Sequence, residues 1–273
     1  MTALAPATRS DARAGHAWGI WDAVRKVAVF IASPVILLII WQILAKAGLL
    51  DPRFFPAPSD ILSSLGTDVA HGSLLHDAAL TTGRLLMGLL IGGVSGLVVG
   101  IAMGLSKAVR AALRPLISMT FPIPKIAILP LFLIMFGLGE TANWAIASVG
   151  VFYPVALNSF AGIGEIDAIH QETATVYRVS LWRRVFTVAL PGALPLILTG
   201  LELGIGIGFL LIVAAEFMGS SAGLGYAIWQ DWQIFDVPSM YAALAVTAIY
   251  GLVIQLVMSL LRRVLVPWRA QHG

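Results

Sequence analysis

Apolar runs of about 20 residues are the feature that most limits what this chain can fold into, because a helix of that length crosses a hydrocarbon core about 30 Å thick. Only 11% of the 273 residues are charged, whereas ordinary soluble domains carry about 25%. The runs lack the alternation of apolar and polar residues that marks the strands of outer-membrane barrels. The sequence therefore predicts an all-α, polytopic membrane protein.

Six segments are predicted to span the membrane, and polar or basic stretches separate them. Their approximate ranges are 27–47, 80–105, 116–137, 144–163, 196–217 and 240–266. The first run is longer than the h-region of a signal peptide, which has about 7–15 residues, so we expect an uncleaved span. The predicted organisation is an N-terminal tail (1–24), a transmembrane domain (25–267) and a C-terminal tail (268–273).

Basic residues fall unevenly on the two sides of these six spans. One side holds most of them: Arg9, Arg13, Arg25, Lys26, Lys107, Arg110, Arg114, Arg178, Arg183, Arg184, Arg262, Arg263 and Arg269. The other side has Lys46, Arg53 and, at the start of the second span, Arg84. The positive-inside rule then predicts that both termini are cytoplasmic.

The third span contains three prolines, Pro122, Pro124 and Pro130. Each removes a backbone donor and disturbs the preceding turn. A broken helix is tolerated in a membrane only where it is buried in protein or lines a wet cavity, so this segment is predicted to lie inside the bundle, along a translocation pathway. Lys125, between two of these prolines, either attracts an anion there or extends to water at the cytoplasmic interface.

A polar and basic insert of about 165–191 interrupts the membrane-like sequence after the fourth span. Its pattern predicts two short helices that are broken near residues 177–180, with apolar side chains such as Trp182 between basic ones. Such a segment fits a groove on a cytosolic partner. It is equally suited to lie on the membrane surface as an amphipathic linker. The pattern alone leaves both interpretations open.

The insert resembles the coupling motif of binding-protein-dependent ABC importer permeases, which reads EAA, three residues, Gly, nine residues, Ile, any residue, Leu-Pro. Residues Glu172-Thr173-Ala174 match its start, Val188 stands at the Ile position, and Leu190-Pro191 closes it. The flanking stretches PIPKIAILPLFLIMFGLGE, GVFYPVALNSFAGI and AAEFMGSSAGLGYAI are similar to the nitrate/sulfonate/taurine-type branch of that family. The resemblance extends from about Val27 to the C-terminus.

One position departs from the family pattern, because Arg178 stands where the motif has glycine. A non-glycine residue in a left-handed conformation costs about 1–2 kcal/mol. A rebuilt turn is therefore expected at this point.

The resemblance implies a type I ABC importer permease-like fold in the bacterial cytoplasmic (inner) membrane. It also implies a permease homodimer, cytosolic ABC ATPase subunits, and a periplasmic or lipid-anchored substrate-binding protein that delivers a small, anionic, nitrate-, sulfonate- or taurine-like solute. The residues expected to carry ATPase coupling are Glu172, Thr173, Ala174, Arg178, Trp182 and Pro191. Those expected along the pathway are Lys125, Pro124, Pro130 and Glu202.

The chain lacks the P-loop pattern GxxxxGK[ST], so ATP is expected to bind the partner ATPase and no cofactor is expected on this chain. It has no cysteine and no clustered histidines, which argues against a metal site and against a membrane-embedded enzyme. No nucleic-acid partner is expected. The alternative function is a secondary transporter driven by an ion gradient, which would need paired acids within the membrane.

Two acids, Glu202 and Glu216, lie on the fifth span. Glu202 either reflects the charge of the transported solute or pairs with an arginine inside the bundle. Glu216, near the outer end of the span, is predicted to brace the long polar loop at about 219–239.

Overall fold

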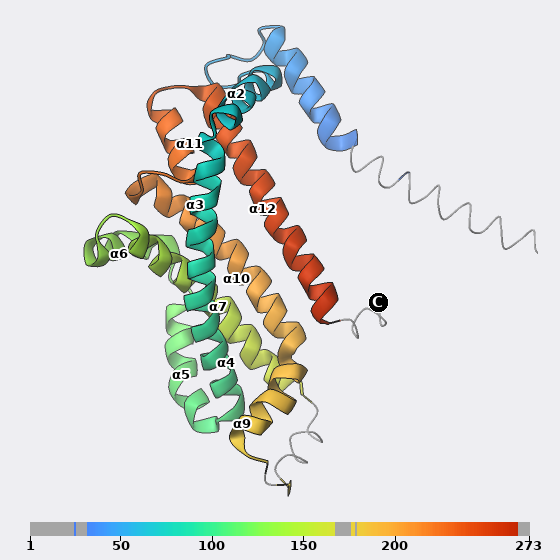
Figure 1. Cartoon of the computed structure of the whole chain (residues 1–273), viewed down its shortest axis with the longest axis vertical. Coiled ribbons are helices and arrows are strands. Elements are labelled where there is room, and N and C mark those ends of the chain that lie inside the picture. The colour runs from blue at the N-terminus through green and yellow to red at the C-terminus, as the bar shows by residue number, and fades with distance from the viewer. Residues whose placement is uncertain (1–24, 26–31, 167–175, 178, 267–273) are drawn as a thin grey trace, which may run out of the picture. The chain divides into compact units, whose positions relative to one another are not determined.

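The computed structural model describes residue 25 and residues 32–166, 176–177 and 179–266 (Figure 1). Within these ranges the chain consists of helices and their connections, and no strand occurs among them. The all-α prediction is therefore confirmed. The chain divides into two compact units, Met1–Ser63 and Ser64–Gly273.

The first unit contains the apolar helix Ala32–Lys46, which is the described part of the predicted first span. An irregular connection, residues 47–57, leads from it to the start of α2 (Pro58–His71). Lys46 Nζ lies 3.0 Å from a carboxylate oxygen of Asp60, and Gln42 Oε1 accepts a hydrogen bond from the backbone N–H of Ser59 at 3.0 Å. These contacts tie the end of the apolar helix to the beginning of α2.

The second unit is built on long apolar helices. The first is continuous from Ser73 to Leu105 and consists of α3 (Ser73–Gly88), a π-helical turn (Leu89–Gly93) and α4 (Val94–Leu105). The others contain α7 (Glu140–Gly164), α10 (Leu190–Gly219) and α12 (Val237–Leu265). Four described helices are long and apolar enough to cross a membrane.

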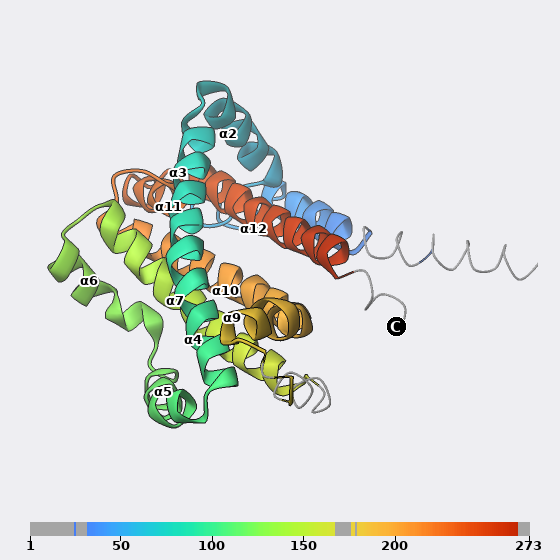
Figure 2. The same ribbon diagram turned by 60° about the horizontal axis from the view of Figure 1, so that its bottom comes forward.

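The third predicted span is broken, as its prolines indicated. It consists of α5 (Lys107–Thr120), a 3₁₀ turn (Lys125–Ile128) and α6 (Leu129–Phe136), with a bend of 90° between the two halves. α6 and the 3₁₀ turn pack against α7, whereas α5 packs against α4, and both halves lie on the side away from α12 (Figure 2). With this pair counted as one span, the described chain has five, so the predicted number of six is not confirmed.

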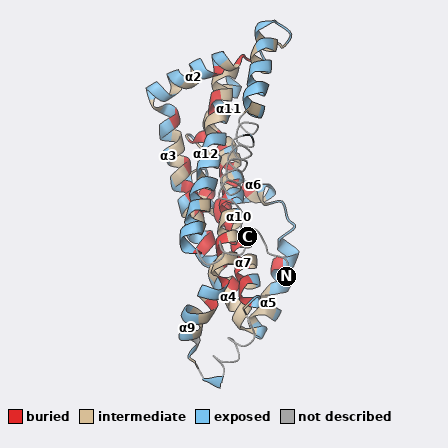
Figure 3. Cartoon of the chain, turned by 90° about the vertical axis from the view of Figure 1, so that its right-hand side faces the viewer, coloured by how far each residue is buried: buried red, intermediate tan, exposed pale blue. Residues whose placement is uncertain are grey.

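The core of the second unit lies where α4, α7 and α10 meet, and buried residues gather there (Figure 3). Glycines on α4 let the backbones of α4 and α7 approach closely. A Cβ atom added at Gly96 would lie 2.7 Å from the carbonyl oxygen of Phe152, and one added at Gly100 would lie 2.5 Å from that of Ala156. The regular spacing of small residues in this span therefore serves helix packing, as expected in membranes.

Three predicted boundaries are wrong. The third span was expected to begin near residue 116, but the basic stretch before it is already helical, because α5 begins at Lys107. The fifth span was expected to begin near residue 196, but α9 (Leu181–Arg184), a π-helical turn (Val185–Ala189) and α10 form one helix that is continuous over Trp182–Gly219. The outer loop contains a further helix, α11 (Leu224–Gln233).

Replacing Gly100 by alanine tests the close packing of α4 on α7. The added methyl group has no space, so we expect the free energy of unfolding to fall by about 1–3 kcal/mol. The measurement is the thermal unfolding midpoint of the purified protein in detergent. Gly66→Ala is the matched control, because nothing lies within 4 Å of a Cβ atom added at Gly66. Equal midpoints for the two variants would contradict this packing.

Candidate coupling element and translocation pathway

Only part of the predicted coupling element falls within the described chain. Glu172, Thr173, Ala174 and Arg178 lie outside the described residues. Trp182 is on α9, and Pro191 is in the first turn of α10. Proline is tolerated at that position because its missing N–H would have no partner in a regular first turn. Here the preceding π-helical turn ends with the N–H of Leu190 donating to the carbonyl of Val185, and the helix continues through Pro191.

Trp182 and Phe186 form an exposed aromatic pair at the start of this long helix. Their ring centroids are 6.4 Å apart and nearly parallel, at 16°. The two residues are four positions apart on the helix, a spacing that brings side chains into contact. Trp182 is 73% exposed and Phe186 is 61% exposed. Large aromatic side chains that are this exposed are typical anchors for a partner protein.

A mostly apolar groove of about 500 Å³ lies between this aromatic pair and the end of α4. Leu105, Ser106 and Val109, at the junction of α4 and α5, form part of its wall. The groove therefore joins the start of the long helix to the end of the second span.

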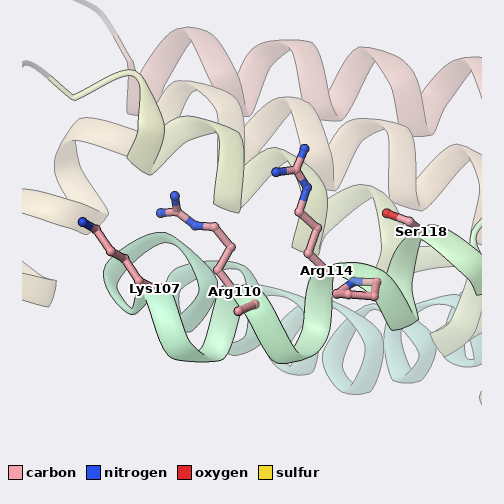
Figure 4. Close-up of a pocket in the computed structure, with 6 residues that line it drawn as sticks. Lys107, Arg110, Arg114 and Ser118 are labelled. Carbon is pink, nitrogen blue, oxygen red and sulfur yellow. The ribbon is translucent and has the colours of Figure 1, made fainter.

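A row of basic side chains follows one face of α5, beginning at the same junction. Lys107, Arg110 and Arg114 point to the same side of the helix, and Ser118 continues the row (Figure 4). Arg110 stabilises the junction of α4 and α5. Its Nε donates a hydrogen bond of 3.0 Å to the carbonyl of Met103, and its Nη2 donates one of 3.0 Å to the carbonyl of Gly104. Lys107 and Arg114 extend the cationic surface beside this contact.

Lys125 stabilises the broken third span. Its Nζ donates to the carbonyls of Thr120, Phe121 and Ile123 at 2.9, 2.8 and 2.9 Å. The ammonium also lies 4.2 Å from the ring centroid of Tyr153, which is within the range of a cation–π interaction. The ammonium thus satisfies carbonyls that the break in the helix leaves without helical partners. Contact of Lys125 with a transported anion stays a prediction.

The prolines predicted along the pathway lie at the bend. Pro124 immediately precedes the 3₁₀ turn, and Pro130 is in the first turn of α6. Both therefore occupy positions where proline starts a helical segment without breaking one. Their contact with a transported solute stays a prediction.

Glu202 pairs with an arginine, which was one of its two predicted interpretations. Its Oε2 lies 3.5 Å from Nη1 of Arg262, across the contact of α10 with α12. The side chains are 29% and 42% exposed, so this is a loose and partly solvated pair. A cleft of about 570 Å³ between the two helices opens beside Glu202.

A buried charged network that includes Arg84 was missed by the sequence analysis. Arg84 was placed at the outer start of the second span, but it lies within the long helix and is 4% exposed. Its Nη1 donates to Glu216 at 2.6 Å, and its Nη2 and Nε donate to Glu140 at 2.5 and 2.9 Å. One arginine therefore joins α3, α7 and α10.

The same network holds the outer loop. Glu216 accepts a hydrogen bond of 2.8 Å from the N–H of Gly225, so it contacts the loop as predicted. Arg84 Nη1 donates to the carbonyl of Ala222 at 2.7 Å, and Asp77 accepts from the N–H of Gly223 at 2.7 Å. Gly223 has φ 123°, a conformation that favours glycine. The presence of Arg84 and Glu216 within otherwise apolar segments was the signal that predicts such pairing.

Acidic residues cluster around α11 beyond this network. Burial first, and then the negative charges of Asp236, Asp68 and Asp77, together raise the pKa of Asp231 to about 6. The charge of this face therefore changes near pH 6.

Residues 92–271 match the family described as the binding-protein-dependent transport system inner membrane component. The match covers more than half of the chain, and the chain belongs to this family. It is therefore a multi-pass component of the inner membrane, as the coupling-motif resemblance predicted.

Relatives place the chain in the predicted branch of the family. It is 34% identical to the taurine transport system permease protein TauC of Escherichia coli (strain K12) over 258 residues, which cover 93% of each chain. It is also 34% identical to the putative aliphatic sulfonates transport permease protein SsuC of Bacillus subtilis (strain 168), over 88% of this chain and 87% of that protein. These relatives are transport permeases and not enzymes.

Two solved structures share the fold. An inward-facing conformation of the MetNI methionine ABC transporter has a TM-score of 0.58 at 19% identity and covers 71% of this chain and 94% of that chain. An amino acid ABC transporter solved with histidines has a TM-score of 0.59 at 20% identity and covers 73% and 97%. The ABC importer permease fold is therefore confirmed.

Replacing Arg84 by methionine tests the buried network. The change leaves the carboxylate of Glu216 buried with no cation, and we expect a loss of about 3–5 kcal/mol in stability. The measurement is the thermal unfolding midpoint, together with protease sensitivity of the loop around Gly223. Arg53→Met is the control, because Arg53 makes an exposed pair with Asp51, and such pairs contribute about 0–1 kcal/mol. If both variants unfold at the same temperature, the network does not hold these helices together.

Proposed function

We propose that this chain is the transmembrane permease of an ATP-driven importer for a small sulfonate-type anion. An external binding protein delivers the solute, and a cytosolic ABC ATPase drives its movement through the 172–191 motif. The observation that carries the proposal is the exposed Trp182–Phe186 pair at the end of a membrane helix that is continuous to Gly219. The class of solute is supported by the relatives, whose names specify taurine and aliphatic sulfonates.

The continuous helix gives the coupling motif a mechanical role. A docked ATPase moves the Trp182 end, and the helix transmits the movement because it contains no break up to Gly219. At the far end, Glu216 is bonded to Arg84 and to the outer loop. Motion imposed on the cytoplasmic side therefore reaches the side that receives the solute.

The orientation with cytoplasmic termini is supported by where basic residues occur in the structure. Lys107 lies just after the end of α4, Arg183 and Arg184 lie on α9, and Arg262 and Arg263 lie in the last turn of α12. Each group lies near the end of an apolar helix, where a basic residue favours the cytoplasmic side.

A permease homodimer is supported by apolar surface that the described part of this chain leaves uncovered. Within the most apolar 18-residue stretch of α12, only 6% of the residues are buried in this chain. In the first unit, Leu37 and Ile43 on the helix Ala32–Lys46 are 66% and 61% exposed. Lipid and a second copy of the chain together account for such surface, and the pathway would then lie between the two copies. The division into tails and transmembrane domain stays a prediction.

The alternative of an ion-driven secondary transporter is less well supported. Such a transporter needs acids that are available to bind the coupling ion within the membrane. In the described residues, both Glu216 and Glu140 pair with Arg84, and Glu202 is a single acid whose neighbour is the cation Arg262. These pairings leave no obvious ion site at the acids named.

Alanine at both Trp182 and Phe186 tests the coupling element. Loss of the two anchors is expected to reduce co-purification of the ATPase subunit at least about 10-fold, because a central aromatic anchor contributes about 2 kcal/mol or more to binding. ATP-driven uptake into vesicles should fall in parallel. Phe235→Ala is the control, since Phe235 is 83% exposed and lies just before α12 on the outer loop.

Two results would contradict the proposal. Unchanged association and uptake in the double variant would remove the coupling role of this pair. Uptake by the unmodified protein that stops with an uncoupler, and does not require ATP, would favour the secondary transporter.

A further inference from the structure

The cleft between α10 and α12 contains opposite charges that are only loosely paired. Glu202 lines the cleft together with Thr199 and Gln255, and Arg262 stands one helical turn beyond Met258, another lining residue. Gly206 and Gly251 leave room between the helices, and the cleft has a volume of about 570 Å³. α10 and α12 are neighbours in the fold (Figure 1).

The Glu202–Arg262 pair differs from the structural pair in the same protein. Arg84 and Glu216 are 2.6 Å apart, with side chains only 4% and 0% exposed. Glu202 and Arg262 are 3.5 Å apart and 29% and 42% exposed. Charge-assisted hydrogen bonds are about 2.7–2.9 Å long, so the second pair is open to exchange its partners. Separating Glu202 from Arg262 costs a ligand little binding free energy, because exposed ion pairs contribute little to stability.

The position of Glu202 indicates that the cleft is wet or faces protein. Glu202 lies near the middle of the apolar helix that is continuous over Trp182–Gly219. A carboxylate facing lipid at that depth is unfavourable, and ionisable residues within spans usually face a bundle interior or a water-filled cavity. The cleft therefore suits a polar solute better than a lipid chain.

We propose that this cleft binds a small zwitterion, with its ammonium on the Glu202 carboxylate and its sulfonate or carboxylate on the Arg262 guanidinium. Each charge of the ligand replaces one half of the loose pair, so both protein charges stay compensated. The amide of Gln255 offers a further donor and acceptor beside them. This inference rests on the proposed sulfonate transport and refines it: Glu202 selects a solute with an amine over a simple anion.

The test measures binding to the purified permease in nanodiscs, without ATP or binding protein. Radiolabelled taurine is the probe, and ethanesulfonate and ethylamine, which each lack one of its charged groups, are competitors. We expect both competitors to bind at least about 10-fold more weakly than taurine, since each loses one hydrogen-bonded charge pair. Glu202→Gln should weaken taurine binding by a similar factor and should not weaken ethanesulfonate binding, because it removes a negative charge beside the sulfonate, whereas Arg262→Gln should weaken both.

Asp51→Asn, an exposed carboxylate that pairs with Arg53, is the matched control and should bind as the unmodified protein does. Size-exclusion profiles establish that the variants are folded. The inference is overturned if taurine does not bind, if ethanesulfonate binds as well as taurine, or if Glu202→Gln has no effect on taurine. ATP-driven sulfonate uptake is measured separately. Absence of this uptake would overturn the proposed function, whereas the zwitterion site is decided by the taurine-binding measurements.

Discussion

The ion pairs of Arg84 are the interaction on which the rest of this structure depends. Arg84 is buried on α3 and bonded to Glu140 on α7 and Glu216 on α10. A buried charge is stable only when it is paired and its hydrogen bonds are satisfied. These requirements fix the positions of three membrane helices relative to one another and, through Gly225, the position of the outer loop. The close packing at Gly96 and Gly100 then holds α4 against α7 further along the same long helix.

The Arg84 network explains physically how movement at a docked ATPase can reach the other end of the permease. The helix that begins at Trp182 is continuous to Gly219, and its Gly219 end is fixed by Glu216. Its Trp182 end presents the exposed aromatic pair next to the basic row of α5. A rigid element with an anchor for a partner at one end and a charged network at the other can carry displacement across the membrane. The family membership and the shared ABC importer fold are consistent with that use.

Part of this was predictable from the sequence. Prolines 122, 124 and 130 predicted the broken third span, and the composition predicted membrane helices. The Arg84 network was not predicted, because nothing local relates residue 84 to residues 140 and 216. The start of the fifth span was placed too late, because polar and basic residues of the insert hid a helix that continues into apolar sequence. Likewise, the start of the third span was placed too late, although Lys107, Arg110, Arg114 and Ser118 share one face of α5.

The central claim is that the helix from Trp182 to Gly219 moves as a rigid body when ATP binds the assembled transporter. The chain has no cysteine, so spin labels can be placed at Thr187→Cys and Met218→Cys without other substitutions. Electron–electron distance measurements with and without ATP test the claim most directly. The account predicts an unchanged distance between labels at the two positions within one chain, and a changed distance between labels at position 187 in the two copies. A change within the chain, or no change between the copies, would contradict it.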